Sequence, residues 1–342
     1  MNESILNTET EKPKRKYWID HARGFVMILL VVTMFLPRSI REGPLRFFLD
    51  HPENQTTTHL MNLYDIGAPA FIVLMGFLMP LSYFKRRERD GFKKAVLHII
   101  IRYGIILFLG LLVVFIDQGS LIKEVDSMTV VRWDVLPTLG LVGLIALPFL
   151  WLEPKIRAAV ASIMLIFYQT MLIFGGWREY GIASVHGGIL GTVFGFSALM
   201  IFSTCLGQLY FYSTDYSENQ KYKFYFLIGT IFFVGGLLLS LIPEWYPNKR
   251  QVTLTYIMIS FGASILLSLF FIALDKKMER PIFGLDSYGK SPFIIYIIAV
   301  VIKFLIEDII GYEIDFIIGI SMILLITTFV LLLDKWGKII KL

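Results

Sequence analysis

The sequence predicts an all-α membrane protein, a single polytopic bundle of about ten transmembrane helices. Two features of composition favour this class: 56% of the 342 residues are hydrophobic and only 17% are charged, whereas soluble domains are about 25% charged. The third observation is that apolar runs recur from Tyr17 to the C-terminus. Each run is close to the roughly 20 residues that a helix needs to cross a bilayer, and no stretch remains for a soluble domain.

The expected spans are separated by polar connections, and most end where proline, glycine or charge interrupts the apolar run. Span one stops at Pro37, and span two stops at a basic block that begins at Lys85. Glu153–Arg157 is expected to form a tight turn, and residues 117–131, 175–185 and 275–290 are expected to be polar loops. The ten spans cover about residues 17–36, 60–84, 95–116, 133–152, 158–174, 186–211, 224–242, 252–274, 292–306 and 316–333.

The distribution of basic residues predicts that both termini are cytoplasmic. About two thirds of the 32 Lys and Arg residues fall in the connections on the N-terminal side, and a quarter fall on the opposite side. Cytoplasmic loops collect Lys and Arg, so the net charge of +5 does not indicate a nucleic-acid partner. Residues 1–16 are then a disordered cytoplasmic tail, and residues 17–342 are one multi-pass domain in the cytoplasmic membrane.

Asp20 and Arg23 lie at the head of span one. A charge inside a bilayer is costly and is most often functional, and residues three apart share one face of a helix. Two interpretations stay open. The residues form an ion pair that seats span one against its neighbours, or they form a polar floor for a ligand bound from the cytoplasmic side.

Two histidines, His51 and His59, share the loop after span one, and Asp65 enters span two. Imidazole titrates near neutrality, so a loop histidine can take a proton from an attacking amine or hydroxyl, or can itself be acylated. Asp65 can orient such a histidine by accepting its second N–H. The spacings of these three residues match no familiar metal motif, so no metal is expected.

Three later residues are candidates for ligand binding. His186 begins the sequence His-Gly-Gly at the start of span six. These glycines allow either a close approach to a ligand or ordinary helix packing. Asn248 and Lys249 precede span eight, where they can hold an anionic group or anchor the helix at the interface.

Together these residues form a pattern. The stretch Asp20-His21-Ala22-Arg23-Gly24, the polar loop with histidine, and Tyr64-Asp65-Ile66-Gly67-Ala68-Pro69-Ala70-Phe71, which continues to Gly76, resemble heparan-α-glucosaminide N-acetyltransferase and its bacterial relatives. The stretches 132–138, 247–256 and 289–296 are also similar. This chain departs from the family in a longer loop between His51 and Asp65, which lacks the usual tryptophan and glycine, and in Ser291, where relatives have asparagine.

The resemblance implies an acyltransferase that moves an acetyl group from cytoplasmic acetyl-CoA to an extracytoplasmic sugar amine or hydroxyl. It makes a loop histidine the key catalytic residue: His51 matches best by position, and His59 is the rival because it lies nearer Asp65. Donor and substrate binding then fall to Asp20, Arg23, His186, Asn248 and Lys249. The resemblance also implies that two chains can pair as a homodimer.

Two other functions are consistent with the sequence. One is a transporter or flippase for a lipid-linked sugar or another small molecule, which the intramembrane charges Arg102, Lys303 and Glu307 favour. The absence of a visible internal repeat argues against it. The other is a catalytically inactive relative that serves in envelope assembly, which the departures in the histidine loop allow.

Overall fold

The computed structural model describes residues 17–36, 61–125, 128–184, 186–278, 280–312 and 314–337. The predicted catalytic histidines His51 and His59 lie outside these residues, as does the predicted tail of residues 1–16. Asp20, Arg23, Asp65, His186, Asn248 and Lys249 all lie within them.

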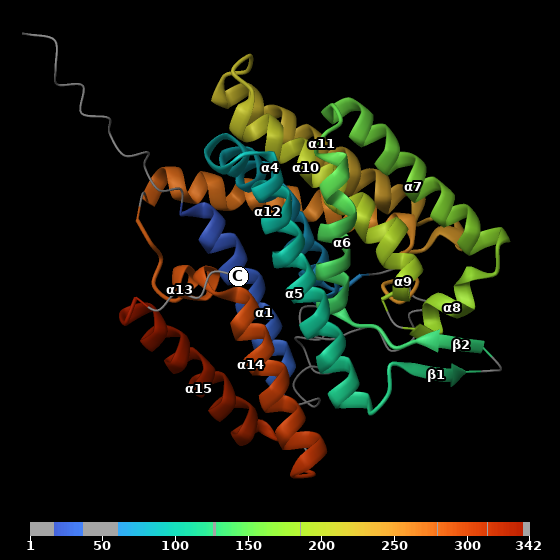
Figure 1. The fold of residues 1–342 in the computed structure, drawn as a ribbon, viewed down its shortest axis with the longest axis vertical. Helices are drawn as coiled ribbons and strands as arrows, with labels where there is room; N and C mark the ends of the chain where they lie inside the picture. Colours follow the sequence, from blue (N-terminus) through green and yellow to red (C-terminus); the bar gives the residue numbers. More distant parts are fainter. Residues whose placement is uncertain are drawn as a thin grey trace, which may run out of the picture.

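The described part of the chain is a helical bundle with one small β-hairpin, as Figure 1 shows. Eight of its helices are long and apolar enough to cross a membrane. This agrees with the predicted all-α membrane bundle. The eight are α1 (Trp18–Phe35), α4 (Gly67–Asp90), α5 (Phe92–Gln118), α7 (Pro154–Phe174), the helix Gly188–Tyr212, α11 (Glu218–Leu239), α12 (Leu254–Met278) and α15 (Phe316–Lys335).

Shorter elements complete the chain. Two are apolar: α6 (Val135–Phe149), and α14 (Pro292–Phe304) with its π-helical continuation Leu305–Ile309. Within Gly188–Tyr212, α9 (Gly188–Leu190) passes through the π-helical turn Gly191–Phe196 into α10 (Ser197–Tyr212). The others are the 3₁₀ turns η1 (Leu63–Ile66) and η3 (Pro243–Trp245), the strands β1 (Ile122–Val125) and β2 (Met128–Val131), and the helices α8 (Trp177–Ser184) and α13 (Leu285–Lys290).

Local sequence explains where several helices begin. The side chain of Asp134 accepts a hydrogen bond from Val135 N at the start of α6, and Asp315 accepts one from Ile318 N at the start of α15. Ser217 and Gln220 form a capping box at the start of α11. These side chains satisfy backbone N–H groups that the first turn of a helix leaves without a partner.

The core of the bundle consists of α1, α4 and α10, whose apolar faces are mostly buried. Trp18 of α1 makes edge-to-face contacts with Phe77 of α4 and Tyr210 of α10, at centroid distances of 5.5 and 5.7 Å. By contrast, α5, α11 and α15 keep large apolar side chains exposed. This is the arrangement expected of peripheral helices whose outer faces contact lipid.

Three predicted loops contain secondary structure. The predicted loop 117–131 forms the antiparallel pair β1–β2, in which Ile122 lies opposite Val131. The loop 175–185 contains α8, and the connection 275–290 contains α13. These elements have four to eight residues, too few for the hydrophobic periodicity that reveals a helix or strand in a sequence. Figure 1 shows the hairpin and α8 together at one end of the bundle, which we call the hairpin end.

The start of α7 also differs from the prediction. Glu153–Arg157 was expected to be a tight turn, but α7 begins at Pro154, a residue whose fixed φ suits the first helical position. Arg157 is therefore inside the helix and is 0% exposed. Its guanidinium donates to Thr204 Oγ1 at 2.9 Å and to Gln208 on α10. A basic residue assigned to a cytoplasmic loop is thus a buried link between two helices.

Two glycines bring α13 against α1. A Cβ atom added to Gly24 of α1 would overlap the carbonyl oxygen of Leu285, and one added to Gly289 of α13 would overlap the carbonyl oxygen of Asp20. Small residues allow helix backbones to approach this closely in membranes. The contact fixes α13 at the end opposite the hairpin, which we call the α13 end.

Replacement of Gly289 by alanine should therefore destabilise the bundle. We expect Gly289→Ala to lower the free energy of unfolding by about 3 kcal/mol, the upper part of the usual range for overpacking, because backbone rather than a flexible side chain opposes the new methyl group. Thermal unfolding of the purified protein, followed by circular dichroism, measures the change. Gly104→Ala on α5 is the matched control, because nothing lies within 4 Å of its added Cβ. Equal melting temperatures for the two variants would show that the α1–α13 contact is absent.

Candidate functional site

Asp65 lies in the 3₁₀ turn that precedes α4, and its side chain is 3% exposed. Asn62 N donates a hydrogen bond to Asp65 Oδ2 at 3.2 Å. Tyr256 of α12 donates its hydroxyl proton to the Asp65 carbonyl oxygen at 2.9 Å. These contacts hold the carboxylate at the hairpin end between α4 and α12.

Lys249 reaches this carboxylate from the loop between η3 and α12. Its Nζ lies 3.8 Å from Asp65 Oδ1, and its side chain is 14% exposed. Burial lowers the pKa of the Lys249 ammonium, while the carboxylates of Asp65 and Asp134 act in the opposite direction. A buried lysine with a lowered pKa is a group that can hold an anion or exchange a proton.

Asn248 shapes the loop that carries Lys249. Its side-chain oxygen accepts a hydrogen bond from Gln251 N at 3.0 Å, and its backbone N–H donates to Thr253 Oγ1 at 3.0 Å. Tyr168 of α7 donates to the Gln251 carbonyl oxygen at 2.8 Å. Asn248 therefore positions its neighbour through this buried network.

His186 lies in the turn between α8 and α9 and is 8% exposed. Its Nε2 is 3.7 Å from Asp134 Oδ1, the carboxylate that also caps α6. Sequence reasoning did not select Asp134. An aspartate before an apolar run is the usual sign of a helix cap, and nothing in its local sequence indicates that His186, 52 positions later, lies beside it.

Two residues near the site have an unusual backbone. His186 has φ 49° and Val252 has φ 57°, a left-handed conformation that is an outlier for a β-branched residue. The two loops contact each other, because Gly187 N donates to the Arg250 carbonyl oxygen at 2.6 Å. Strain of this kind gathers at functional sites, and no sequence signal marks it at Val252.

The structure thus gathers ionisable side chains from four parts of the chain at the hairpin end. We call Asp65, Lys249, Asp134 and His186 the hairpin-end cluster. Three of them were predicted as site residues from sequence, and Asn248 supports the cluster. A lysine between two carboxylates, with an imidazole beside one of them, can hold a polar ligand and pass a proton along the series.

A pocket of about 480 Å³ lies at the same end and shares Asp134 with the cluster. We call it the outer pocket. It lies between α5 and α14 and is bordered by the hairpin, the α6 cap and α8. Its volume is within the range of small-molecule sites, about 300–1,000 Å³.

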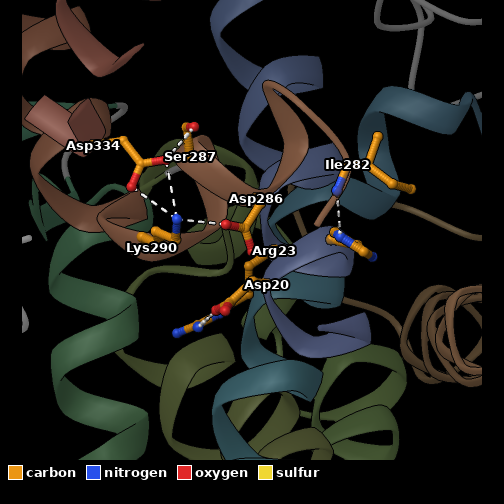
Figure 2. Close-up of polar contacts among 8 residues, drawn as sticks. Asp20, Arg23, Ile282, Asp286, Ser287, Lys290 and Asp334 are labelled. Atoms are coloured by element: carbon orange, nitrogen blue, oxygen red, sulfur yellow. Dashed lines mark hydrogen bonds and ion pairs between the residues drawn. The ribbon is translucent and has the colours of Figure 1, made fainter. Parts of the chain in front are cut away.

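Asp20 and Arg23 lie at the opposite, α13 end. They form the predicted ion pair. Figure 2 shows it beside a second group, in which Lys290 Nζ contacts Asp286 and lies 2.8 Å from Asp334 Oδ1. Ser287 donates to Asp334 Oδ2 at 2.7 Å. This group joins α13 to α15, whereas the Asp20–Arg23 pair lies within α1.

The α13 end also carries a basic groove on α4, with a volume of about 320 Å³. Lys85, Arg86 and Arg89 line it together with Leu78, Leu81 and Ser82. Arg89 is paired with Asp90, with an N–O distance of 2.8 Å. The groove combines positive charge with an apolar side, which suits the phosphates of an amphiphilic anion.

Within the described ranges, no three His, Cys, Asp or Glu residues are grouped to hold a metal ion. Comparison of the chain with models of known protein families and with curated proteins yields no match.

Proposed function

We propose that the protein is a membrane acyltransferase that moves an acetyl group from cytoplasmic acetyl-CoA to an extracytoplasmic sugar amine or hydroxyl. One observation carries this proposal: the buried Asp65–Lys249 pair lies beside His186 and Asp134, next to a pocket of substrate size. Sequence resemblance supplies the reaction class and makes His51 or His59 the catalytic residue.

In this proposal the chain crosses the membrane ten times, through the eight long helices and through α6 and α14. The hairpin end is extracytoplasmic and the α13 end is cytoplasmic, which puts both termini in the cytoplasm. The basic groove on α4 then faces the cytoplasm, where it meets the phosphates of the donor. The host membrane is the cytoplasmic membrane, and two copies of the chain can pair.

In the proposed reaction, the acceptor nitrogen or oxygen attacks the thioester carbonyl carbon. The carbon–sulfur bond breaks, and coenzyme A leaves as the thiolate. His51 or His59 takes the proton that the acceptor loses and returns it to the leaving sulfur. Asp65 orients the histidine, and Lys249 contacts the Asp65 carboxylate. The alternative, in which the histidine first carries the acetyl group, uses the same residues.

A transporter or flippase for a lipid-linked sugar is the second candidate, because Lys303 and Glu307, two of the intramembrane charges, line the outer pocket. Radiolabelled acetyl-CoA separates the two functions. An acyltransferase transfers or hydrolyses the label, whereas a transporter leaves it intact and moves its substrate across the wall of a sealed vesicle.

His51→Ala should lower acetyl transfer by about 10²–10⁴-fold, the usual value of general-base help, and should leave a folded, extractable protein. His98→Ala on α5 is the control and should keep full activity. Transfer of radiolabelled acetyl to a sugar amine is the measurement. If His59→Ala loses activity and His51→Ala does not, the base is His59; if both keep it, no loop histidine is catalytic.

The Asp65–Lys249 pair is testable by a double-mutant cycle. Asp65→Leu or Lys249→Met alone should cost about 3–5 kcal/mol of stability, because each removes one partner of a buried ion pair. The double variant should recover much of that loss. Acetyl transfer should stay low in all three variants. Recovery of acetyl transfer in the double variant would show that the Asp65–Lys249 pair stabilises the fold and takes no part in the reaction.

Cysteine labelling in intact cells checks the orientation. With Cys205 replaced by alanine, Glu124→Cys on β1 should react with a membrane-impermeant maleimide, whereas Glu88→Cys on α4 should react only after lysis. Both glutamates are exposed, so accessibility to the reagent depends on the side of the membrane. The reverse pattern would invert the proposed topology.

A further inference from the structure

The outer pocket has two chemically different parts. Its apolar wall consists of Met34 of α1, Val113 and Val114 of α5, and Val300 and Phe304 of α14. The hairpin, the α6 cap and the end of α14 supply charged residues. A small water-soluble sugar would not bind favourably against the apolar wall, because its hydroxyl groups would lose hydrogen bonds to water there.

The helices on both sides of the apolar wall expose large apolar side chains. On α5, Phe115 is 50% exposed and Ile116 is 54% exposed. Val301 of α14 is 42% exposed, and Leu305 in the π-helical continuation of α14 is 43% exposed. Exposed apolar faces on transmembrane helices contact lipid. The apolar wall of the pocket therefore lies between two helices that border the hydrocarbon of the bilayer.

The charged part of the pocket is balanced. It contains three acids, Asp117, Asp134 and Glu307, and three bases, Lys123, Arg132 and Lys303. Lys303 Nζ lies 3.7 Å from Glu307 Oε2, so the charges of these two residues offset each other. This balance disfavours a polyanion. It suits a head group with many hydrogen-bond donors and acceptors and little net charge.

Two basic residues retain hydrogen-bonding capacity. The Nε of Arg132 is buried and has no hydrogen-bond partner among the described residues, although its Nη1 donates to Gln118. Trp133 is fixed by hydrogen bonds from its Nε1 to Thr138 and Thr192. Lys123 forms no hydrogen bond or ion pair within the described part of the chain. Arg132 and Lys123 both line the pocket and are partly exposed, so a ligand oxygen can accept hydrogen bonds from their side chains.

We infer that the outer pocket binds a lipid-linked sugar, with the sugar among the charged residues and the lipid chain along the apolar wall between α5 and α14. This inference rests on the proposed function for its second part: the bound lipid-linked sugar is the acetyl acceptor. Asp134 belongs both to the pocket and to the hairpin-end cluster, so the sugar lies next to the cluster.

The probe for this inference is a long-chain alkyl glucosaminide with a photoreactive diazirine in the first carbons of its chain. Methyl glucosaminide, which has the same sugar without the chain, is the competitor. The protein is held in lipid nanodiscs without acetyl-CoA, and mass spectrometry locates the crosslinked peptides. We expect crosslinks on α5 and α14, and we expect excess methyl glucosaminide to compete poorly.

A matched pair of variants on adjacent residues makes the test specific. Val300→Trp fills the apolar wall, whereas Val301→Trp adds the same bulk to the lipid-facing side of α14. Val300→Trp should lower the crosslinking yield by about tenfold, the effect of losing roughly two buried methylene groups, and Val301→Trp should leave it unchanged. Equal yields in both variants, or full competition by methyl glucosaminide, would overturn the inference.

Acetyl transfer is measured separately on the same variants. If Val300→Trp loses crosslinking but the wild-type protein acetylates no sugar, the binding site stands and the proposed enzyme function fails. If the wild-type protein acetylates soluble glucosamine as well as the lipid-linked form, and Val300→Trp keeps both activities, the function stands and the lipid-linked acceptor is wrong.

Discussion

The constraint on which this structure depends is the cost of placing charge inside an apolar bundle. An ionised group in hydrocarbon must find an opposite charge or hydrogen-bond partners, and partners come from helices that are distant in sequence. Asp65 meets Lys249 across 184 positions, and Lys290 meets Asp334 across 44. Each pair therefore ties together elements that hydrophobic contact alone would leave free to slide, since lipid tails are as apolar as the helices.

Close backbone approach supplies the rest of the specificity. Where Gly24 and Gly289 meet, α1 and α13 are near enough for His21 Nε2 to accept a hydrogen bond from Ile282 N at 3.1 Å. At the hairpin end, Gly187 allows the turn with His186 to contact the loop with Val252. Glycine contacts and charged pairs thus occur together at each end of the bundle. Glycine allows two backbones to approach closely, and this approach brings the side chains they carry within reach of their partners.

Sequence could predict the long helices because twenty consecutive apolar residues have few alternatives to a membrane span. It also placed Asp65, His186 and Lys249 among the candidates: Asp65 enters span two after the histidine loop, His186 begins a His-Gly-Gly sequence, and Lys249 follows Asn248 before span eight. It could not predict Asp134, whose partner depends on packing, or the left-handed Val252. The rule that basic residues mark cytoplasmic loops misplaced Arg157, because a guanidinium satisfied by Thr204 and Gln208 can enter a helix. His51 and His59 remain predictions from sequence.

The two ends of the bundle differ in a way that bears on function. At the α13 end, Lys290 is enclosed by Asp286 and Asp334 and the group ties α13 to α15, which suits a fixed joint. At the hairpin end, Lys249 is buried beside Asp65, and the neighbouring Asp134 faces a pocket of about 480 Å³. Arg132, at the same pocket, keeps a buried N–H without a partner among the described residues. Buried arginine N–H groups without a partner occur elsewhere in the described residues, as at Arg157 Nε, so it is the pocket beside Arg132 and Asp134 that distinguishes the hairpin end as the place for a ligand.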